Sequence, residues 1–121
     1  MAQLQIELVS AERVVWSGEA SFVVARTAEG ELGALPGHTP VLSVIKPSVV
    51  EITTADGEKV KAAVEDGFLS IANDRVSILS EEAILADEID AEAAKAERDS
   101  AEPDSLAWQF ADAKVRATEK S

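Results

Sequence analysis

The sequence has no cysteine and no tyrosine, and its aromatic residues are limited to two tryptophans and three phenylalanines. Without cysteine, disulfides and thiolate metal sites are excluded. Basic residues are also scarce, since 11 lysines and arginines face 23 acidic residues and leave a net charge of −12. Such a surface repels nucleic-acid phosphates, and few aromatics are available to stack on bases. We therefore predict no nucleic-acid partner.

The chain also lacks any apolar run close to the ~20 residues that a membrane-spanning helix needs. Its first residues, MAQLQIELVS, have neither the basic start nor the apolar stretch of a signal peptide. At the same time, 46% of the residues are hydrophobic, which is typical of a folded globular chain. We expect a folded protein that does not insert into a membrane.

Residues 1–87 follow the two-residue period of β-strands. In LQIEL, Leu4, Ile6 and Leu8 alternate with polar residues, so one face of the strand is apolar. Similar segments recur between turn signals about every eight to twelve residues, which is typical of a β-sandwich or barrel. The aromatic residues lie mostly in these apolar runs, and we expect them in the core.

Three short segments are expected to be turns between strands. Asp56-Gly57 predicts a two-residue hairpin turn, because that turn needs positive φ at both central positions. Asn73-Asp74 is a second hairpin candidate, and Trp16-Ser17-Gly18 is expected to separate two strands. These turns divide the N-terminal domain into several short antiparallel strands.

Residues 88–121 are rich in alanine and contain no glycine, which favours helix. Asp90 and Ser105 are suited to cap two helices, and the short break around Pro103 predicts that the helices form an antiparallel pair. The expected apolar faces are Ile89, Ala93 and Ala96 in the first helix and Leu106, Phe110, Ala113 and Ala117 in the second. Alanine buries little surface and short helices are marginal alone, so we predict an arm that rests on the β-domain and can leave it.

No segment has the pattern of a catalytic or cofactor site. The stretch GELGALPGHTPVL, residues 30–42, contains the only histidine, His38, but the sequence has no G-x-S-x-G elbow around a serine nucleophile. Its glycines lack the lysine of a phosphate-binding loop, and the acidic run ADEIDAE lacks the spacing of a calcium loop. We predict no catalytic residue, metal or cofactor. Two non-catalytic functions stay open. The chain is a subunit of a larger assembly or, as the alternative, a stand-alone β-sandwich that binds a ligand or peptide.

The segment GELGALPGHTPVLSVIKPSVVEI resembles the signature of the epsilon subunit of the F-type ATP synthase, G-E-[LI]-G-[IV]-L-P-G-H-[TA]-P-L-L followed by a K-P-G turn. LVSAERVVWSGEA, EDGFLSIANDRVSILSEEA and EIDAEAA are similar to other segments of that family, in the same order, so the resemblance covers nearly the whole chain. Ala34 and Ser48 depart from the signature. The short hairpin is similar to that of actinobacterial members.

The resemblance implies a flattened antiparallel β-sandwich of about ten strands with a C-terminal antiparallel two-helix hairpin. It also implies a non-catalytic rotor subunit of the central stalk, at the cytoplasmic face of the bacterial cell membrane, that helps couple proton translocation to ATP synthesis. The implied partners are the gamma subunit and the c ring. The helical arm would contact the alpha/beta hexamer transiently and modulate ATP hydrolysis.

The resemblance also assigns residues to partners. The expected contacts with the c ring are Glu29, Glu31 and Gly33, those with gamma are Ser10, His38 and Thr39, and the arm would act through Asp90, Arg98, Lys114 and Arg116. Some members bind ATP through [IL]-D-x-x-R-A, which here begins with Ile89 and Asp90 but has Ala93 in place of the arginine. Because the charge that would meet a phosphate is missing, we predict no ATP sensing and only modest modulation of hydrolysis.

Overall fold

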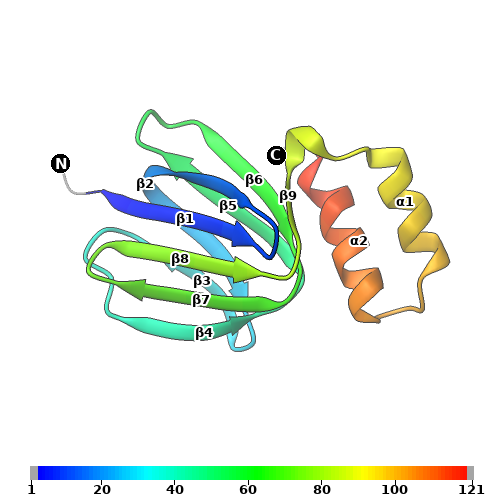
Figure 1. Ribbon diagram of the computed structural model, residues 1–121, viewed down its shortest axis with the longest axis horizontal. Coiled ribbons are helices and arrows are strands. Elements are labelled where there is room, and N and C mark those ends of the chain that lie inside the picture. The colour runs from blue at the N-terminus through cyan, green and yellow to red at the C-terminus, as the bar shows by residue number, and fades with distance from the viewer. Residues whose placement is uncertain (1–2, 120–121) are drawn as a thin grey trace.

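Strands occupy the chain up to Leu85 and helices follow, as the change from a two-residue to a helical period predicts (Figure 1). The computed structural model describes residues 3–119. Its elements are β1 (Leu4–Ser10), β2 (Val14–Thr27), β3 (Gly30–Ala34), β4 (Val41–Ile45), β5 (Ser48–Thr54), β6 (Lys59–Val64), β7 (Gly67–Ala72), β8 (Arg75–Ser80), β9 (Ala83–Leu85), the 3-10 turn η1 (Ala86–Glu88), α1 (Ala91–Ser100) and α2 (Leu106–Ala117). The described helices are all too short to cross a membrane.

The long strand β2 joins the two layers of the sandwich. Its first half pairs antiparallel with β1, and β1 continues through β8 and β7 to β4 as one layer. Its second half pairs with β3 on one side and β5 on the other, and β5 continues to β6 and β9 as the second layer. The described part of the chain thus forms a sandwich of nine strands.

The expected turn at Trp16-Ser17-Gly18 is wrong, because these residues lie inside β2. The strand continues because Gln5 to Leu8 of β1 pair along it, and this long-range ladder outweighs the local turn preference. Gly18 has a packing role here, since a Cβ atom at this position would lie 3.0 Å from the Trp16 ring. The register shifts farther on, between Ala20 and Phe22, where β2 passes from one layer to the other.

The core is aliphatic. Leu4, Ile6 and Leu8 are fully buried, which confirms the alternation expected for β1. Each such side chain contributes roughly 1.5–3 kcal/mol when it leaves water. The prediction of aromatic residues in the core is confirmed only in part. Phe110 is buried and Trp16 packs against the core, but Phe68 is 56% exposed and the remaining aromatic side chains are only partly buried.

The two predicted hairpins both form, but one has a different turn. Asn73 and Asp74 have φ values of 53° and 62°, as a two-residue turn with positive φ at both centres requires. In the other hairpin only Gly57 has positive φ, and the Gly57 N–H donates to the Thr54 carbonyl oxygen at 2.9 Å. That hairpin therefore closes with a three-residue loop ending in a left-handed glycine, not with two residues.

The helix caps are as predicted, but the buried face of α1 is not. Asp90 accepts hydrogen bonds from the N–H groups of Glu92 and Ala93, and Ser105 accepts one from Trp108. In α1 the buried residue is Ala94, whereas Ala93 and Ala96 are exposed. The face differs because α1 packs mainly on α2.

The helix α2 lies between α1 and the sandwich (Figure 1). Its residues Phe110, Ala113 and Ala117 pack on Ala63 of β6 and form a second apolar cluster, apart from the core of the sandwich. This confirms most of the expected face of α2. Leu106, however, is 59% exposed and stays outside the cluster.

Candidate interaction surfaces

Four large apolar side chains face solvent on the layer formed by β1, β8, β7 and β4. They are Leu42, Val44, Phe68 and Leu79, with exposed fractions of 77%, 48%, 56% and 54%. The strand register places Val44 opposite Phe68, and Phe68 opposite Leu79. We call these four residues the outer apolar face. A row of adjacent exposed apolar side chains is typical of a surface that binds another protein.

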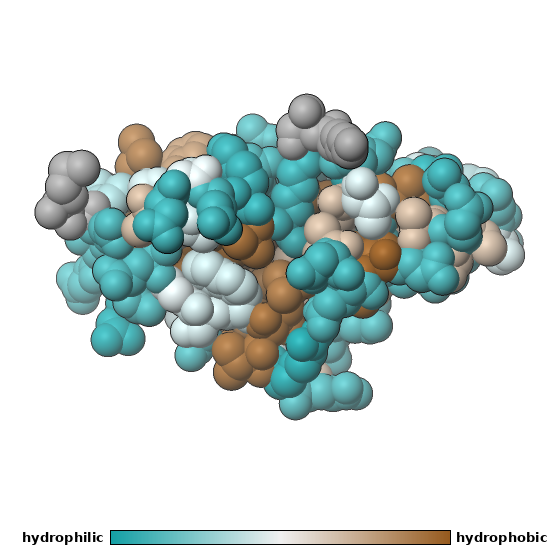
Figure 2. Space-filling view, turned by 90° about the horizontal axis from the view of Figure 1, so that it is seen from above, coloured by the Kyte–Doolittle hydropathy of each residue, from teal (hydrophilic) through white to brown (hydrophobic). Residues whose placement is uncertain are grey.

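Seen from above, apolar residues form a band across the middle of a largely hydrophilic surface (Figure 2). The sequence contains a signal for the outer apolar face in the segment VLSVI of β4, where apolar residues occupy both sides of the strand. Such a strand resembles a fully buried one, so the pattern alone does not show that one side is uncovered.

The expected gamma contacts lie at opposite ends of this layer. Ser10 ends β1, next to Ser80 at the end of β8. His38 lies in the loop before β4, which is tied to the β7–β8 turn by a 2.7 Å hydrogen bond from the Gly37 N–H to Asp74 Oδ1. The structure therefore separates Ser10 from His38 and Thr39, with the outer apolar face on the strands between them.

The hydroxyl of Ser10 is already engaged within the chain. Ser10 is only 8% exposed. Its Oγ lies 3.3 Å from the Arg13 carbonyl oxygen and also accepts hydrogen bonds from the N–H groups of Glu12 and Arg13. His38 is partly exposed, with Nδ1 2.7 Å from the Thr39 carbonyl oxygen. Of the three residues, Thr39 is the exposed one.

The expected c-ring residues lie in the acidic turn between β2 and β3, which holds Glu29, and in the first residues of β3, which include Glu31 and Gly33. The buried Thr27 donates its hydroxyl to the Gly30 carbonyl oxygen at 2.8 Å and accepts the Glu29 N–H at 3.2 Å. Glu29 and Glu31 are exposed on either side of Gly30, so the structure brings them together. Gly33 lets the Phe22 ring pack closely on β3, since a Cβ atom there would lie 3.0 Å from the end of that ring.

The three basic residues predicted to act in the arm, Arg98, Lys114 and Arg116, pair with acidic residues of the arm itself. Arg98 of α1 and Arg116 of α2 both bind Asp112, at 3.0 and 3.1 Å. Lys114 binds Glu97 of α1 at 2.6 Å, lies 4.8 Å from the centre of the Phe110 ring, and its side chain is only 14% exposed. Arg98–Asp112 and Lys114–Glu97 therefore join α1 to α2, whereas Arg116–Asp112 lies within α2.

The residues of the partial nucleotide motif also serve the fold. Asp90 Oδ1 caps α1, and Ile89 packs against the second apolar cluster. Ala93 is exposed. Within residues 3–119, no group of three or more histidine and acidic side chains is placed to hold a metal ion.

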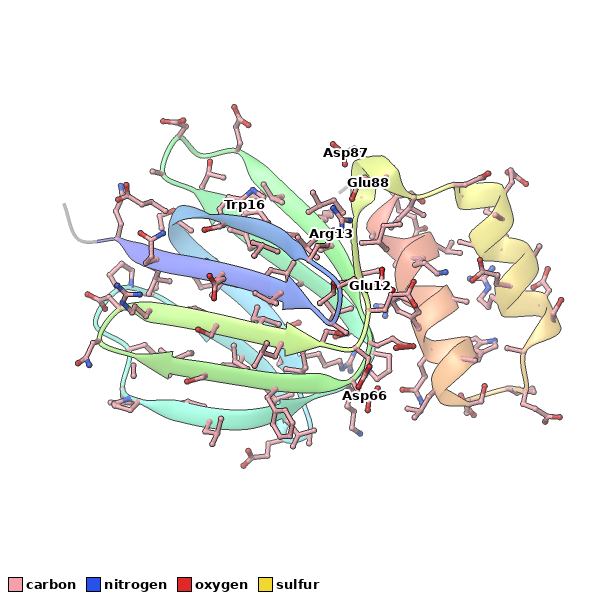
Figure 3. The ribbon with its side chains drawn as sticks, viewed as in Figure 1. Glu12, Arg13, Trp16, Asp66, Asp87 and Glu88 are labelled. Atoms are coloured by element: carbon pink, nitrogen blue, oxygen red, sulfur yellow. The ribbon has the colours of Figure 1, made fainter. Side chains whose placement is uncertain are left out.

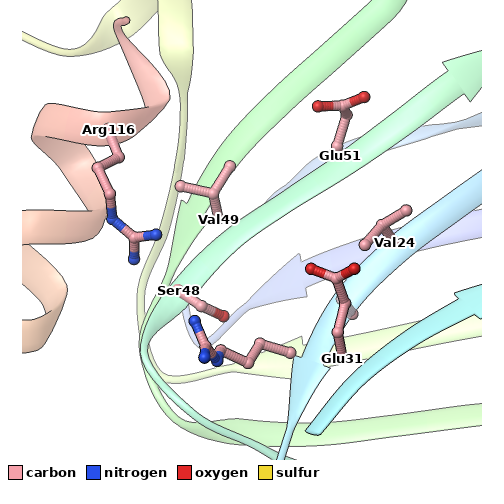
Figure 4. A pocket seen from close by; sticks show the side chains of 8 residues that line it. Val24, Glu31, Ser48, Val49, Glu51 and Arg116 are labelled. Carbon is pink, nitrogen blue, oxygen red and sulfur yellow. The ribbon is translucent and has the colours of Figure 1, made fainter. Parts of the chain in front are cut away.

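An open cleft of about 350 Å³ lies between α2 and the second layer. Its charged lining consists of Arg26, Glu31, Glu51 and Arg116, and Figure 4 shows the Arg116 side chain extending from α2 toward the sandwich. A small-molecule site is usually an apolar cavity with a few polar groups. This cleft is instead lined largely by charged side chains, so it does not favour the alternative that the chain is a ligand-binding module.

Acidic residues crowd the end of the sandwich that faces the arm. Partial burial and the nearby carboxylates of Glu82, Asp66 and Glu81 raise the pKa of Glu65, and only Lys114 opposes them. A raised pKa means that the folded chain holds this proton more tightly than the unfolded chain does. Charged Glu65 therefore costs stability above its pKa, and the cost disappears as the pH falls through it.

Glu65→Gln should accordingly raise the melting temperature at pH 7 by about 1–3 °C, because it removes a partly buried charge that the nearby carboxylates repel. The gain should shrink as the pH falls through the raised pKa of Glu65, because the wild-type side chain then becomes neutral too. Thermal unfolding followed by circular dichroism from pH 4 to 7 measures this. The exposed Glu58 of the β5–β6 loop serves as the control, and an equal gain from Glu58→Gln would contradict the explanation.

The comparison with known proteins agrees with this architecture. Residues 3–86 match the family described as "ATP synthase, Delta/Epsilon chain, beta-sandwich domain". The ATP synthase epsilon chain of Streptomyces avermitilis is 52% identical, over 96% of this chain and 95% of its own length. The epsilon chain of Rhodococcus opacus is 50% identical over the full length of both chains.

Solved structures show the same fold. A chain in a structure of the OSCP, F1 and c-ring of the Euglena gracilis mitochondrial ATP synthase superposes with a TM-score of 0.69 at 25% identity, over 95% of this chain and 76% of the other. A chain from the Tetrahymena thermophila central stalk and c ring, 16% identical over 95% of this chain and 90% of the other, reaches 0.59. Sandwich and hairpin together are thus of the delta/epsilon type. The chain belongs to the family of ATP synthase epsilon chains.

Proposed function

We propose that the chain is a non-catalytic rotor subunit in the central stalk of a bacterial ATP synthase, at the cytoplasmic face of the cell membrane. Its relatives are epsilon chains, which are subunits of that complex. The observation that carries the proposal is the outer apolar face, with Phe68 at its centre, because a monomer gains nothing from exposing such a row. In this role the chain helps couple proton translocation to ATP synthesis.

We assign residues 1–87 to docking and the outer apolar face to the gamma subunit. Ser10 and His38 mark the two ends of the layer that carries this face. His38 and Thr39 would contact gamma beside the apolar row. Ser10 would act indirectly, since its hydroxyl holds the β1–β2 turn in place.

We assign the acidic β2–β3 turn to the c ring. Glu29 and Glu31 are exposed there, and the buried Thr27 fixes the backbone around them. A pre-ordered turn loses little conformational entropy on binding. The carboxylates would meet basic or amide groups on the ring, and Gly33 would keep the strand behind them correctly packed.

We assign residues 88–121 to a regulatory arm that contacts the alpha/beta hexamer transiently. Acidic residues of the arm form ion pairs with its basic residues Arg98, Lys114 and Arg116. Contacts with acidic partners would therefore require these pairs to be exchanged, which limits the gain. The arm would modulate ATP hydrolysis modestly, and no ATP would be needed to hold it.

The parent complex, stripped of this subunit, tests the proposal when it is reconstituted with the full chain or with residues 1–88. Both forms should rebind and restore proton-coupled activity, because the outer apolar face and the acidic turn lie within residues 1–88. Hydrolysis should be about two- to threefold higher with residues 1–88, the effect of a few exposed charge contacts. ATP hydrolysis and proton pumping are the measurements.

Each outcome bears on a different part of the proposal. Failure of both forms to rebind would overturn the assignment to the central stalk. A many-fold rise in hydrolysis with residues 1–88 would show that the arm is a strong brake and contradict modest modulation. The full chain supplies the matched control for both readouts.

A further inference from the structure

The segment between β9 and α1 is the point at which the arm joins the sandwich. The last strand pairing is that of Leu85 with Ala62 of β6. The turn η1 follows, has no buried residue and receives no side-chain cap. Asp90 then begins α1, and its hydrogen bonds are used within the helix. Apart from the partly buried side chains of Ala86 and Ile89, which pack at the edge of the second apolar cluster, the connection is held to the sandwich by polar contacts at its surface.

Arg13 reaches this connection from a rigid turn. The Ser10 N–H donates to the Arg13 carbonyl oxygen at 2.9 Å, and the Ser10 hydroxyl bonds the Glu12 and Arg13 backbone. Ala11 is held in addition by the Glu81 carbonyl oxygen at 3.4 Å. The side chain of Arg13 thus starts from a backbone that is fixed relative to the sandwich.

Arg13 Nη2 donates to Glu88 Oε1 at 2.9 Å, across 75 positions of sequence. Figure 3 shows the two side chains meeting beside the turn that leads into the arm. This hydrogen bond also holds the pKa of Glu88 below its ordinary value, so the pair is ionic at neutral pH. A second hydrogen bond joins the arm to the sandwich just after the C-terminus of α2, where Lys61 Nζ of β6 donates to the Glu119 carbonyl oxygen at 3.3 Å.

We propose that Arg13 is a latch residue: it holds Glu88, and with it the hinge formed by residues 86–90, against the sandwich, and thereby sets how often the arm opens. The α1 helix has one buried residue, Ala94, and is held to the sandwich mainly through α2. Opening at the hinge therefore carries both helices away, still joined by the Arg98–Asp112 and Lys114–Glu97 pairs.

The side chains of Arg13 and Glu88 are 48% and 43% exposed, so the latch is a modest one. Exposed ion pairs alter an equilibrium by about two- to fivefold. The buried centre of the contact between α2 and the sandwich consists of one phenylalanine and three alanines, with partly buried aliphatic residues around it, so it is small enough for such a change to matter. The regulatory meaning of the latch rests on the proposed function, but the latch itself is a property of the isolated chain.

Hydrogen exchange of the full chain at neutral pH measures arm opening directly. Arg13→Ala should speed exchange of α2 amides, such as those of Ala113 and Val115, by about two- to fivefold. The β8 amides should be unchanged, because the sandwich has its own core. The charge swap Arg13→Glu with Glu88→Arg should restore the slower exchange.

Lys59→Ala is the matched control. Lys59 pairs with Glu51 at 3.3 Å with similar exposure, but both residues belong to the sandwich. Unchanged α2 exchange in Arg13→Ala, or an equal change in Lys59→Ala, would overturn the latch. Since no other subunit is present, neither result depends on whether the chain is a central-stalk subunit.

Discussion

Phe68→Asp is expected to weaken binding of the chain to its parent ATP synthase by about 30- to 1,000-fold, or 2–4 kcal/mol. Phe68 lies between Val44 and Leu79 in the strand register, at the centre of the outer apolar face. An aspartate there would place an unpaired charge in an apolar contact. The substitution should leave the fold intact, because the side chain is 56% exposed and its strand neighbour Leu69 supplies the core.

The binding is measured with the stripped parent complex and the purified full chain. Leu106→Asp is the matched control, since Leu106 is similarly exposed at 59% but lies at the start of α2. It should bind like the wild type. Normal binding by a folded Phe68→Asp variant would remove the outer apolar face from the docking surface.

Gly67→Ala is expected to destabilise the fold by about 2–4 kcal/mol. A Cβ atom at this position would collide with the carbonyl oxygen of Leu79, and its three nearest atoms all belong to the backbone of Leu79 and Ser80 in β8. Gly67 opens β7 opposite Ser80, where the two strands are held by their ladder. The backbone cannot move aside without breaking that pairing.

Urea unfolding followed by circular dichroism measures this loss. Gly18→Ala is the control, because a Cβ atom there would meet only the outer part of the Trp16 ring, which can shift. The control should lose less than about 1 kcal/mol. Equal stability of the two variants would contradict the explanation that the close approach of β7 and β8 requires glycine at position 67.

Features decided by neighbouring residues could be predicted from the sequence. The alternation of Leu4, Ile6 and Leu8 gives the buried face of β1, and the caps at Asp90 and Ser105 form as expected. Each depends on a few adjacent residues. The epsilon-type resemblance likewise rested on contiguous segments, and the family comparison confirms it.

Features decided by distant partners could not be predicted. Trp16-Ser17-Gly18 looks like a turn until β1 is placed beside it, and the buried face of α1 depends on the position of α2. To predict the outer apolar face, one would have to know which side of β4 is exposed to solvent. The contact of Arg13 with Glu88 joins residues 75 positions apart. The partner contacts assigned to Glu31 and His38 stay predictions.

The most direct test of the central-stalk role is to isolate the tagged full chain from detergent-solubilised membranes of its own cells and identify what accompanies it. The account predicts ATP synthase subunits in fixed proportion, including gamma and the c ring. Recovery of the chain alone, or with a ligand or peptide and no ATP synthase subunit, would contradict it.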